Sequence, residues 1–165
     1  MRWLIIALLL LVIPLRVTAA DGAAVFERNA PVKITADHLD ADDSKQVLVF
    51  SGAVQAQQGD VFIYAKTMTV HYAAATAKGG RRDITQVVAD GDVRIVQTGR
   101  TATGRHAVFD RVDGKITLTG DPRVVEGENN VSGERIIVYL NDNRSIVEGG
   151  KQRVRAMFVP GEKNQ

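Results

Sequence analysis

Two interleaved series of small residues recur along this sequence at fixed spacings. Gly91 and Gly120 lie 29 residues apart, and each is followed 13 residues later by a second glycine, Gly104 or Gly133. Self-similarity at a fixed period marks folds in which similar supersecondary units stack side by side. We therefore expect such repeated units here. The first series consists of Gly52, Gly91, Gly120 and Gly149, and the second series consists of Ala36, Ala65, Gly104 and Gly133.

Apolar residues around the first series alternate with other residues. Leu48 and Phe50 precede Gly52 by four and two residues, and Val54 and Ala56 follow it by two and four. A period of two is typical of a β-strand with one buried face. The next two units repeat the pattern with Val87, Ala89, Val93 and Ile95 around Gly91, and with Ile116, Leu118, Pro122 and Val124 around Gly120.

Around the second series the apolar residues change parity. Ile63 lies two residues before Ala65, but Met68 lies three residues after it and Val70 lies five residues after it. A strand that keeps one face inward across an odd step needs an extra residue. We therefore predict a β-bulge or corner at each residue of the second series, where only Gly or Ala leaves room.

The composition is that of one β-rich domain. Hydrophobic residues make up 45% of the 165 residues and charged residues 24%, which argues against disorder. Aromatic residues make up only 5%, so the core must consist mainly of Val, Ile, Leu and Ala. No segment after Ala20 shows a helical period. The sequence predicts an all-β fold of antiparallel strands, which could close as a barrel, pair as a sandwich or form a two-walled trough.

The N-terminus has the pattern of a cleavable signal peptide. Arg2 is followed by an apolar run over residues 4–13, and the small residues Ala19 and Ala20 offer the cleavage site. An uncleaved anchor is the alternative, but a spanning helix needs about 20 apolar residues, and Pro14 interrupts this run. The expected organisation is a signal peptide over 1–20, a flexible leader over 21–30, one domain over 31–160 and a polar tail over 161–165.

Removal of the signal peptide would leave a chain without net charge. Loss of Arg2 and Arg16 lowers the Lys plus Arg count from 21 to 19, equal to the 19 Asp and Glu residues. Nucleic-acid binding, which needs a concentrated basic face, is therefore disfavoured. The sequence has no Cys, so it can form neither a disulfide bond nor a thiolate metal site. An exported domain of this size can depend on its hydrophobic core alone.

Catalytic and metal sites have weak support in the sequence. The histidines are His38, His71 and His106, and two of them share the position two residues after the second series, which faces away from the apolar side. They do not form a closely spaced ligand set. Many Asp residues lie at turns, where their side chains bond the local backbone. We predict no catalytic residue, no metal and no cofactor, with a polysaccharide-acting β-fold enzyme as the alternative from another class.

Short segments form a spaced set that covers nearly the whole mature chain. They are VKITAD from Val32, LVFSGAV from Leu48, IYAK from Ile63 with its continuation to Val70, the pair Gly79-Gly80, LTGD from Leu118, VSGE from Val131 with its continuation to Leu140, and the segment from Arg153 to Pro160. As a spaced set they are specific, although each one alone is degenerate. The set resembles the LptA/OstA-like family of periplasmic lipopolysaccharide-transport bridge proteins.

The resemblance implies a twisted, open β-jellyroll, a V-shaped trough whose apolar groove takes the acyl chains of lipopolysaccharide. It also implies a periplasmic bridge between the inner and outer membranes. The implied partners are an inner-membrane anchored transport component, the N-terminal domain of the outer-membrane lipopolysaccharide-assembly barrel, and further copies joined head to tail. Exposed first and last strands suit such joints. A membrane-anchored sister component of the same system is the nearest alternative.

The candidate lipid-binding groove consists of residues that the alternation places on the apolar face. The resemblance implies that this face binds the acyl chains of lipopolysaccharide. In an ordinary domain the same face would form a closed core. The expected groove residues are Val32, Ile34, Leu48, Phe50, Val54, Ile63, Met68, Val70, Val93, Ile95, Phe109, Ile116, Leu118, Ile136 and Val138.

Overall fold

The computed structural model describes residues 31–74, 83–142 and 144–160. The predicted signal peptide with its cleavage at Ala19 or Ala20, the leader over 21–30, the tail over 161–165 and most of the inserted loop lie outside these ranges. In the part that is described, no helix is long and apolar enough to span a membrane. The regular structure within it consists of β-strands, as the period of two predicted.

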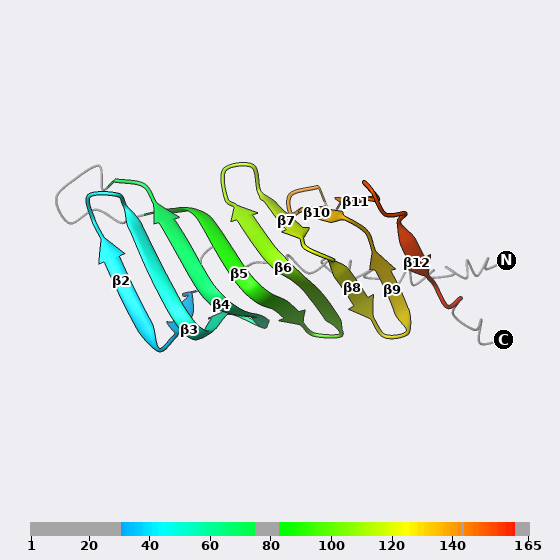
Figure 1. Cartoon of the computed structure of the whole chain (residues 1–165), viewed down its shortest axis with the longest axis horizontal. Helices are drawn as coiled ribbons and strands as arrows, with labels where there is room; N and C mark the ends of the chain where they lie inside the picture. Colours follow the sequence, from blue (N-terminus) through cyan, green and yellow to red (C-terminus); the bar gives the residue numbers. More distant parts are fainter. Residues whose placement is uncertain (1–30, 75–82, 143, 161–165) are drawn as a thin grey trace, which may run out of the picture.

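Antiparallel strands lie side by side in one sheet, with β2 near one end of the array and β12 at the other (Figure 1). The sheet does not close on itself, because its path runs from β1 to β11 without a return pairing. The strands are β1 (Lys33–Thr35), β2 (His38–Asp42), β3 (Val47–Gln58), β4 (Val61–Tyr72), β5 (Ile84–Gln97), β6 (Arg100–Asp110), β7 (Lys115–Thr119), β8 (Arg123–Glu126), β9 (Asn129–Ser132), β10 (Arg135–Tyr139), β11 (Arg144–Glu148) and β12 (Arg155–Met157).

The sheet consists of two walls that share the long strands β3 to β6. At the N-terminal end, β1 and β2 pair with different halves of β3, and further along β7 and β8 pair with different halves of β6. The first wall therefore has the order β1, β3, β4, β5, β6, β8, β9, β12. The second wall has the order β2, β3, β4, β5, β6, β7, β10, β11. The line along which the two walls meet is called the corner. The side of the trough opposite that line is called the rim.

The inward residues of each wall form a continuous cross-strand ladder. Within a ladder, each residue lies directly opposite the next one on the neighbouring strand, so the apolar face keeps its register across the whole sheet. In the second wall the ladder is Leu39, Phe50, Met68, Ala89, Ala107, Leu118, Ile136 and Val147. In the first wall it is Ile34, Ala56, Ile63, Ile95, Ala102, Val124, Val131 and Ala156.

Strand breaks at Ala36, between β1 and β2, and at Gly133, between β9 and β10, confirm the corner predicted at the second series, but the extra residue of each bulge lies at the first series. Gly52 and Ala53 both have positive φ, 80° and 42°. Between Ser51 and Val54, strand β3 contains one more residue than β4 does on the opposite side. Gly91 and Gly120 repeat this geometry with the residues that follow them. The extra residue therefore lies on the strand next to the one predicted.

The second series still needs small residues, as predicted. Strand β4 buries Ala65 and then Met68, so the odd step in its inward face is real. A Cβ atom on Gly104 would lie 2.9 Å from the carbonyl oxygen of Thr119, and one on Gly133 would lie 2.6 Å from that of Glu148. These contacts are shorter than van der Waals distances, so the neighbouring strand leaves no space for a larger side chain.

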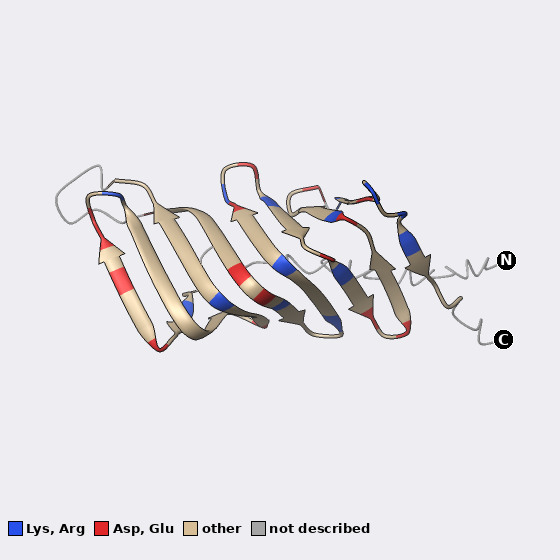
Figure 2. Ribbon diagram, viewed as in Figure 1, with Lys and Arg blue, Asp and Glu red and all other residues tan. Residues whose placement is uncertain are grey.

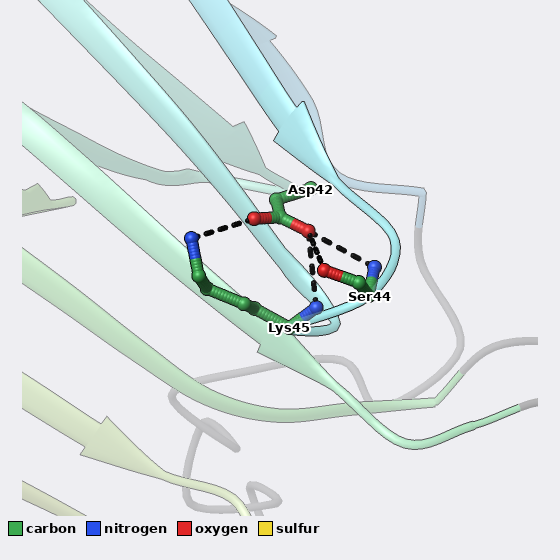
Figure 3. A network of polar contacts seen from close by, with 3 residues as sticks. All are labelled: Asp42, Ser44 and Lys45. Atoms are coloured by element: carbon green, nitrogen blue, oxygen red, sulfur yellow. Dashed lines mark hydrogen bonds and ion pairs between the residues drawn. The ribbon is translucent and has the colours of Figure 1, made fainter.

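A polar network fixes the turn between β2 and β3 (Figure 3). The Asp42 carboxylate accepts hydrogen bonds from the backbone N–H groups of Ser44, at 3.0 Å, and Lys45, at 3.1 Å, and its other oxygen lies 2.8 Å from Lys45 Nζ. The Lys45 side chain, followed by Ser44, holds the pKa of Asp42 well below its usual range. Asp42 therefore stays ionised at any pH except a strongly acidic one.

Candidate functional site

A cavity of about 570 Å³ lies between the two walls, toward the rim. This volume is in the range of ligand-binding pockets. The first wall supplies residues of β1, β3 and β4, and the second wall supplies residues of β4, β5 and β6, of the turn after β6 and of the turn after β10. Its lining consists of Val32, Ile34, Ala56, Gln57, Gln58, Val61, Ile63, Met68, Val70, Ile84, Val87, Phe109, Arg111, Val112, Gly114, Leu140 and Asn141.

All the predicted groove residues lie on the inner side of the trough, but only some of them border open space. Those that line the cavity are Val32, Ile34, Ile63, Met68, Val70 and Phe109. The remaining ones pack in the hydrophobic core, and they are Leu48, Phe50, Val54, Val93, Ile95, Ile116, Leu118, Ile136 and Val138. Whether any of these residues contacts lipid stays a prediction.

The trough is sealed near the corner and open near the rim. Leu118 is 2% exposed and Ile136 is 1% exposed, and both lie within three residues of the corner. Pro122, directly after the corner, is also fully buried. In contrast, Ile84 and Leu140 lie at strand ends near the rim and border the cavity. The inner face therefore serves as a core at its base and as a cavity wall at its mouth.

Several lining residues were missed by the sequence analysis. Val61 lies two residues before Ile63 and Leu140 lies two residues after Val138, so the same period, continued to the strand ends, would have found both. Val87 was part of the alternation around Gly91 but was not among the predicted groove residues. Gln57, Gln58, Arg111 and Asn141 carry no such signal because an apolar alternation does not select polar residues.

Among the described residues that line the cavity, Arg111 is the one with a charged side chain. Its backbone N–H donates a hydrogen bond to the carbonyl oxygen of Thr85, 3.0 Å away, which holds it at the rim end of β6. Its side chain is exposed, and Val112 beside it is 82% exposed. With Asn141 also in the lining, the mouth combines a positive charge and an amide with an apolar interior. Such an arrangement suits an amphiphile with an anionic head group.

Polar groups elsewhere in the described residues do not assemble into a reactive site. His106 Nδ1 lies 2.5 Å from Asp90 Oδ1 on the outer face of the second wall, in line with the predicted outward position. Across the described ranges, no set of three or more His, Asp or Glu side chains could hold a metal ion. The same ranges contain no buried polar or charged side chain. The buried interior of the trough is therefore apolar in the part that the structure describes, and the polar lining residues Gln57, Gln58, Arg111 and Asn141 are not buried.

The two ends of the sheet expose large apolar side chains. Among the described strands, β1 and β2 pair only with β3, β11 pairs only with β10, and β12 pairs only with β9, so each has an edge that no other described strand covers. Leu39 on β2 is 50% exposed and Phe158 after β12 is 73% exposed. With the exception of Val112, every exposed large apolar residue of the described chain lies at one of these ends: Val32, Leu39, Val154, Met157, Phe158 and Val159. Free apolar edges are sites for pairing with another chain.

Comparison with known proteins gives the same family as the spaced motifs. An uncharacterized protein of Rhizobium meliloti (strain 1021) is 26% identical over 133 residues, which cover 79% of this chain and 72% of that protein. The crystal structure of LptH from Pseudomonas aeruginosa, the LptA homologous periplasmic component of the conserved lipopolysaccharide transport device, matches with a TM-score of 0.68 and 20% identity. That match covers 81% of this chain and 98% of the LptH chain, and it confirms the open β-jellyroll. Because residues 33–144 match the family described as LptA/(LptD N-terminal domain) LPS transport protein, this chain belongs to that family.

Proposed function

We propose that this protein binds the acyl chains of lipopolysaccharide in the cavity between its walls and conducts the lipid across the periplasm toward the outer membrane. The observation that carries the proposal is the cavity of about 570 Å³ between two apolar walls, in a chain of a lipopolysaccharide transport family. In an ordinary domain the apolar faces of the two walls would pack against each other and leave no cavity of this size. Within the described ranges no strand pair closes the trough, so a head group could remain in water while acyl chains lie inside.

The magnitude of the hydrophobic effect explains why a protein trough is needed. Burial of one methylene group contributes about 0.8 kcal/mol, so a lipid with several acyl chains cannot cross water unaided at a useful rate. A continuous apolar surface lowers that barrier because the chains never become fully hydrated. The described part of this protein shows no nucleotide-binding element that could supply energy. We infer that an ATP-hydrolysing partner drives the movement.

The partners follow from the same proposal. The chain would be exported, lose its signal peptide and act in the periplasm. One free edge would join an inner-membrane anchored component, the other would join the N-terminal domain of the outer-membrane assembly barrel, and further copies would join head to tail between them. The free edges at β1 and β2 and at β11 and β12 support such joints.

Site-specific photo-crosslinking tests the cavity as the lipid site. Phe109 lines the cavity, whereas His106, on the same strand, faces outward toward Asp90. A photoreactive amino acid at position 109 should capture lipopolysaccharide, and one at position 106 should give only background capture. The readout is the fraction of protein shifted to the lipid adduct on a gel. Equal capture at both positions would refute binding inside the trough.

Charge reversal at the mouth tests the place of the head group. Arg111→Glu should weaken lipopolysaccharide binding by about tenfold, because it replaces a charge-assisted contact by repulsion of an anionic group. Arg111→Lys should retain most of the affinity. Arg123→Glu is the matched control, since Arg123 is exposed on β8 and does not line the cavity. Displacement of a fluorescent lipid gives the dissociation constants, and the same loss in both Glu variants would point to a non-specific charge effect.

A further inference from the structure

We propose that the outer surface of the first wall docks on an anionic phospholipid membrane. Two rows of outward side chains cover this surface, and along each strand they alternate with the inward ladder of the same wall. The two rows together are called the basic face. The inference concerns the outside of the wall and does not depend on the cavity.

The row next to the corner alternates hydroxyl groups with polar or basic side chains. Each member lies directly opposite the next one on the neighbouring strand, in the order Thr35, Gln55, Tyr64, Arg94, Thr103, Arg123, Ser132 and Arg155. The repeat contributes to this order, because Arg94 and Arg123 both lie three residues after a member of the first series. Neighbouring strands are about 4.8 Å apart, so successive Arg side chains of this row start about 10 Å from each other.

The row nearer the rim is rich in apolar side chains. Its members, again directly opposite one another, are Lys33, Gln57, Phe62, Val96, Thr101, Val125, Asn130 and Met157. Met157 is 51% exposed, and Phe62, Val96 and Val125 are partly exposed. In the first row, the guanidinium carbon of Arg94 lies 4.1 Å from the centre of the Tyr64 ring. Basic, aromatic and apolar side chains therefore lie side by side on one surface.

The two rows contain basic residues but no acidic ones. The basic residues are all exposed, and they are Lys33, Arg94, Arg123 and Arg155. None of the ion pairs among the described residues involves any of these four. Figure 2 shows the basic bands on β8 and β12, whose single basic residues are Arg123 and Arg155. Glu126 of β8 has the inward parity and lies 3.0 Å from Arg100 at the rim. The positive charge of the basic face is therefore not neutralised by the described part of the chain.

The outer surface of the second wall has a different charge pattern. Its outward strand residues include the bases Lys115, Arg135 and Arg144 and the acids Asp40, Asp42, Asp90, Asp110 and Glu148. Removal of the signal peptide would leave the whole chain without net charge, so the excess of base on the first wall is a local feature. A charge concentrated on one face orients a protein toward a surface of opposite charge.

The combination of basic and apolar side chains favours a lipid surface as the occupant. Anionic head groups attract each Lys or Arg that approaches the membrane. Apolar and aromatic side chains lie at the boundary between head groups and acyl chains. The strands of the array run in similar directions, so the two rows stay on one side of the molecule, as contact with an extended surface requires (Figure 1). A soluble polyanion would use the basic residues alone, whereas an anionic membrane uses both rows.

Sedimentation with vesicles tests the proposal on the chain after removal of the predicted signal peptide. The protein should bind vesicles of phosphatidylglycerol and phosphatidylcholine in equal parts at least about tenfold more tightly than vesicles of phosphatidylcholine alone, and added salt should weaken this binding. Arg123→Glu should weaken it by about thirtyfold, because each charge near an anionic membrane contributes about a factor of five. Arg144→Glu is the matched control on the outer surface of the second wall and should change it by less than about threefold.

The apolar row can be tested separately with a fluorescent side chain. The one Trp of the sequence is Trp3, which lies in the predicted signal peptide. Met157→Trp should shift its emission to shorter wavelength when the vesicles with phosphatidylglycerol are added, because the indole leaves water for the head-group region. Ile146→Trp, at an outward position of the second wall, should show no shift.

Equal binding to both kinds of vesicle, or an equal loss in Arg123→Glu and Arg144→Glu, would overturn the proposal. Release from the vesicles by inositol hexakisphosphate together with an unshifted Met157→Trp would assign the face to a soluble polyanion and would also overturn it. The basic face and the cavity can be told apart with two variants. Arg123→Glu should weaken vesicle binding and leave displacement of a fluorescent lipid from the cavity unchanged, whereas Arg111→Glu should do the reverse. Absence of vesicle binding would leave the capture of lipopolysaccharide at Phe109 as a separate result.

Discussion

Gly120→Ala should lower the free energy of unfolding by about 2–4 kcal/mol, whereas Gly127→Ala should lower it by about 1–2 kcal/mol. Both glycines have positive φ, 75° and 57°, so a Cβ atom costs about 1–2 kcal/mol at either site. Only at Gly120 would the new Cβ also lie 2.5 Å from Arg105 Cβ. At Gly127 it would meet no atom within 4 Å. Urea denaturation of both variants measures the difference.

The contact at Gly120 cannot relax easily because Arg105 is held on both sides. Its backbone N–H donates a hydrogen bond to the carbonyl oxygen of Gly120 at 3.0 Å, and its guanidinium lies 2.6 Å from the Asp121 carboxylate. The exposed ion pair itself contributes little stability. The backbone bond, in contrast, fixes Arg105 Cβ over the glycine. An equal loss of stability in the two variants would show that the corner is not closely packed.

The corner also shows how far the sequence could predict the fold. The alternation around Gly52 and Gly91 correctly gave the inward residues, and the odd step at Ala65 correctly showed that neighbouring strands differ by one residue. Side-chain parity does not tell which of two paired strands holds the extra residue. The position of the extra residue depends on backbone conformation. Gly52 and Ala53 both adopt a left-handed φ, and an apolar pattern contains no information about φ.

The candidate site was predictable as a face but not as a cavity. The period of two places Phe109 and Leu118 on the same side of the sheet, and the structure does so as well. Only Phe109 borders open space, because Leu118 lies next to the corner, where the walls converge. The separation of the walls is a property of the whole sheet. The charge at the mouth was hidden for a different reason, since Arg111 lies in a turn where strand periodicity ends.

Val87→Asp should weaken lipopolysaccharide binding by at least about 100-fold, equal to about 2.8 kcal/mol. Val87 lines the cavity from the second wall and is half-buried. An aspartate there keeps its water as long as no lipid is bound, so the fold should survive the change. Acyl chains that enter must strip that water from an unpaired carboxylate, which costs several kcal/mol. Displacement of a fluorescent lipid measures the affinity, and circular dichroism measures the fold.

Val88→Asp is the matched control, because the same exchange occurs one residue further along the same strand. Val88 lies opposite Thr69 and Val108, and it belongs neither to the cavity lining nor to the core. Its carboxylate would remain in water whether or not lipid is bound, so the affinity should change by less than about threefold. If both variants lost affinity equally, or if Val87→Asp bound lipid normally, the acyl chains would have to lie outside the trough. A loss confined to Val87→Asp would show that the inward face of the repeat is the surface that carries the lipid.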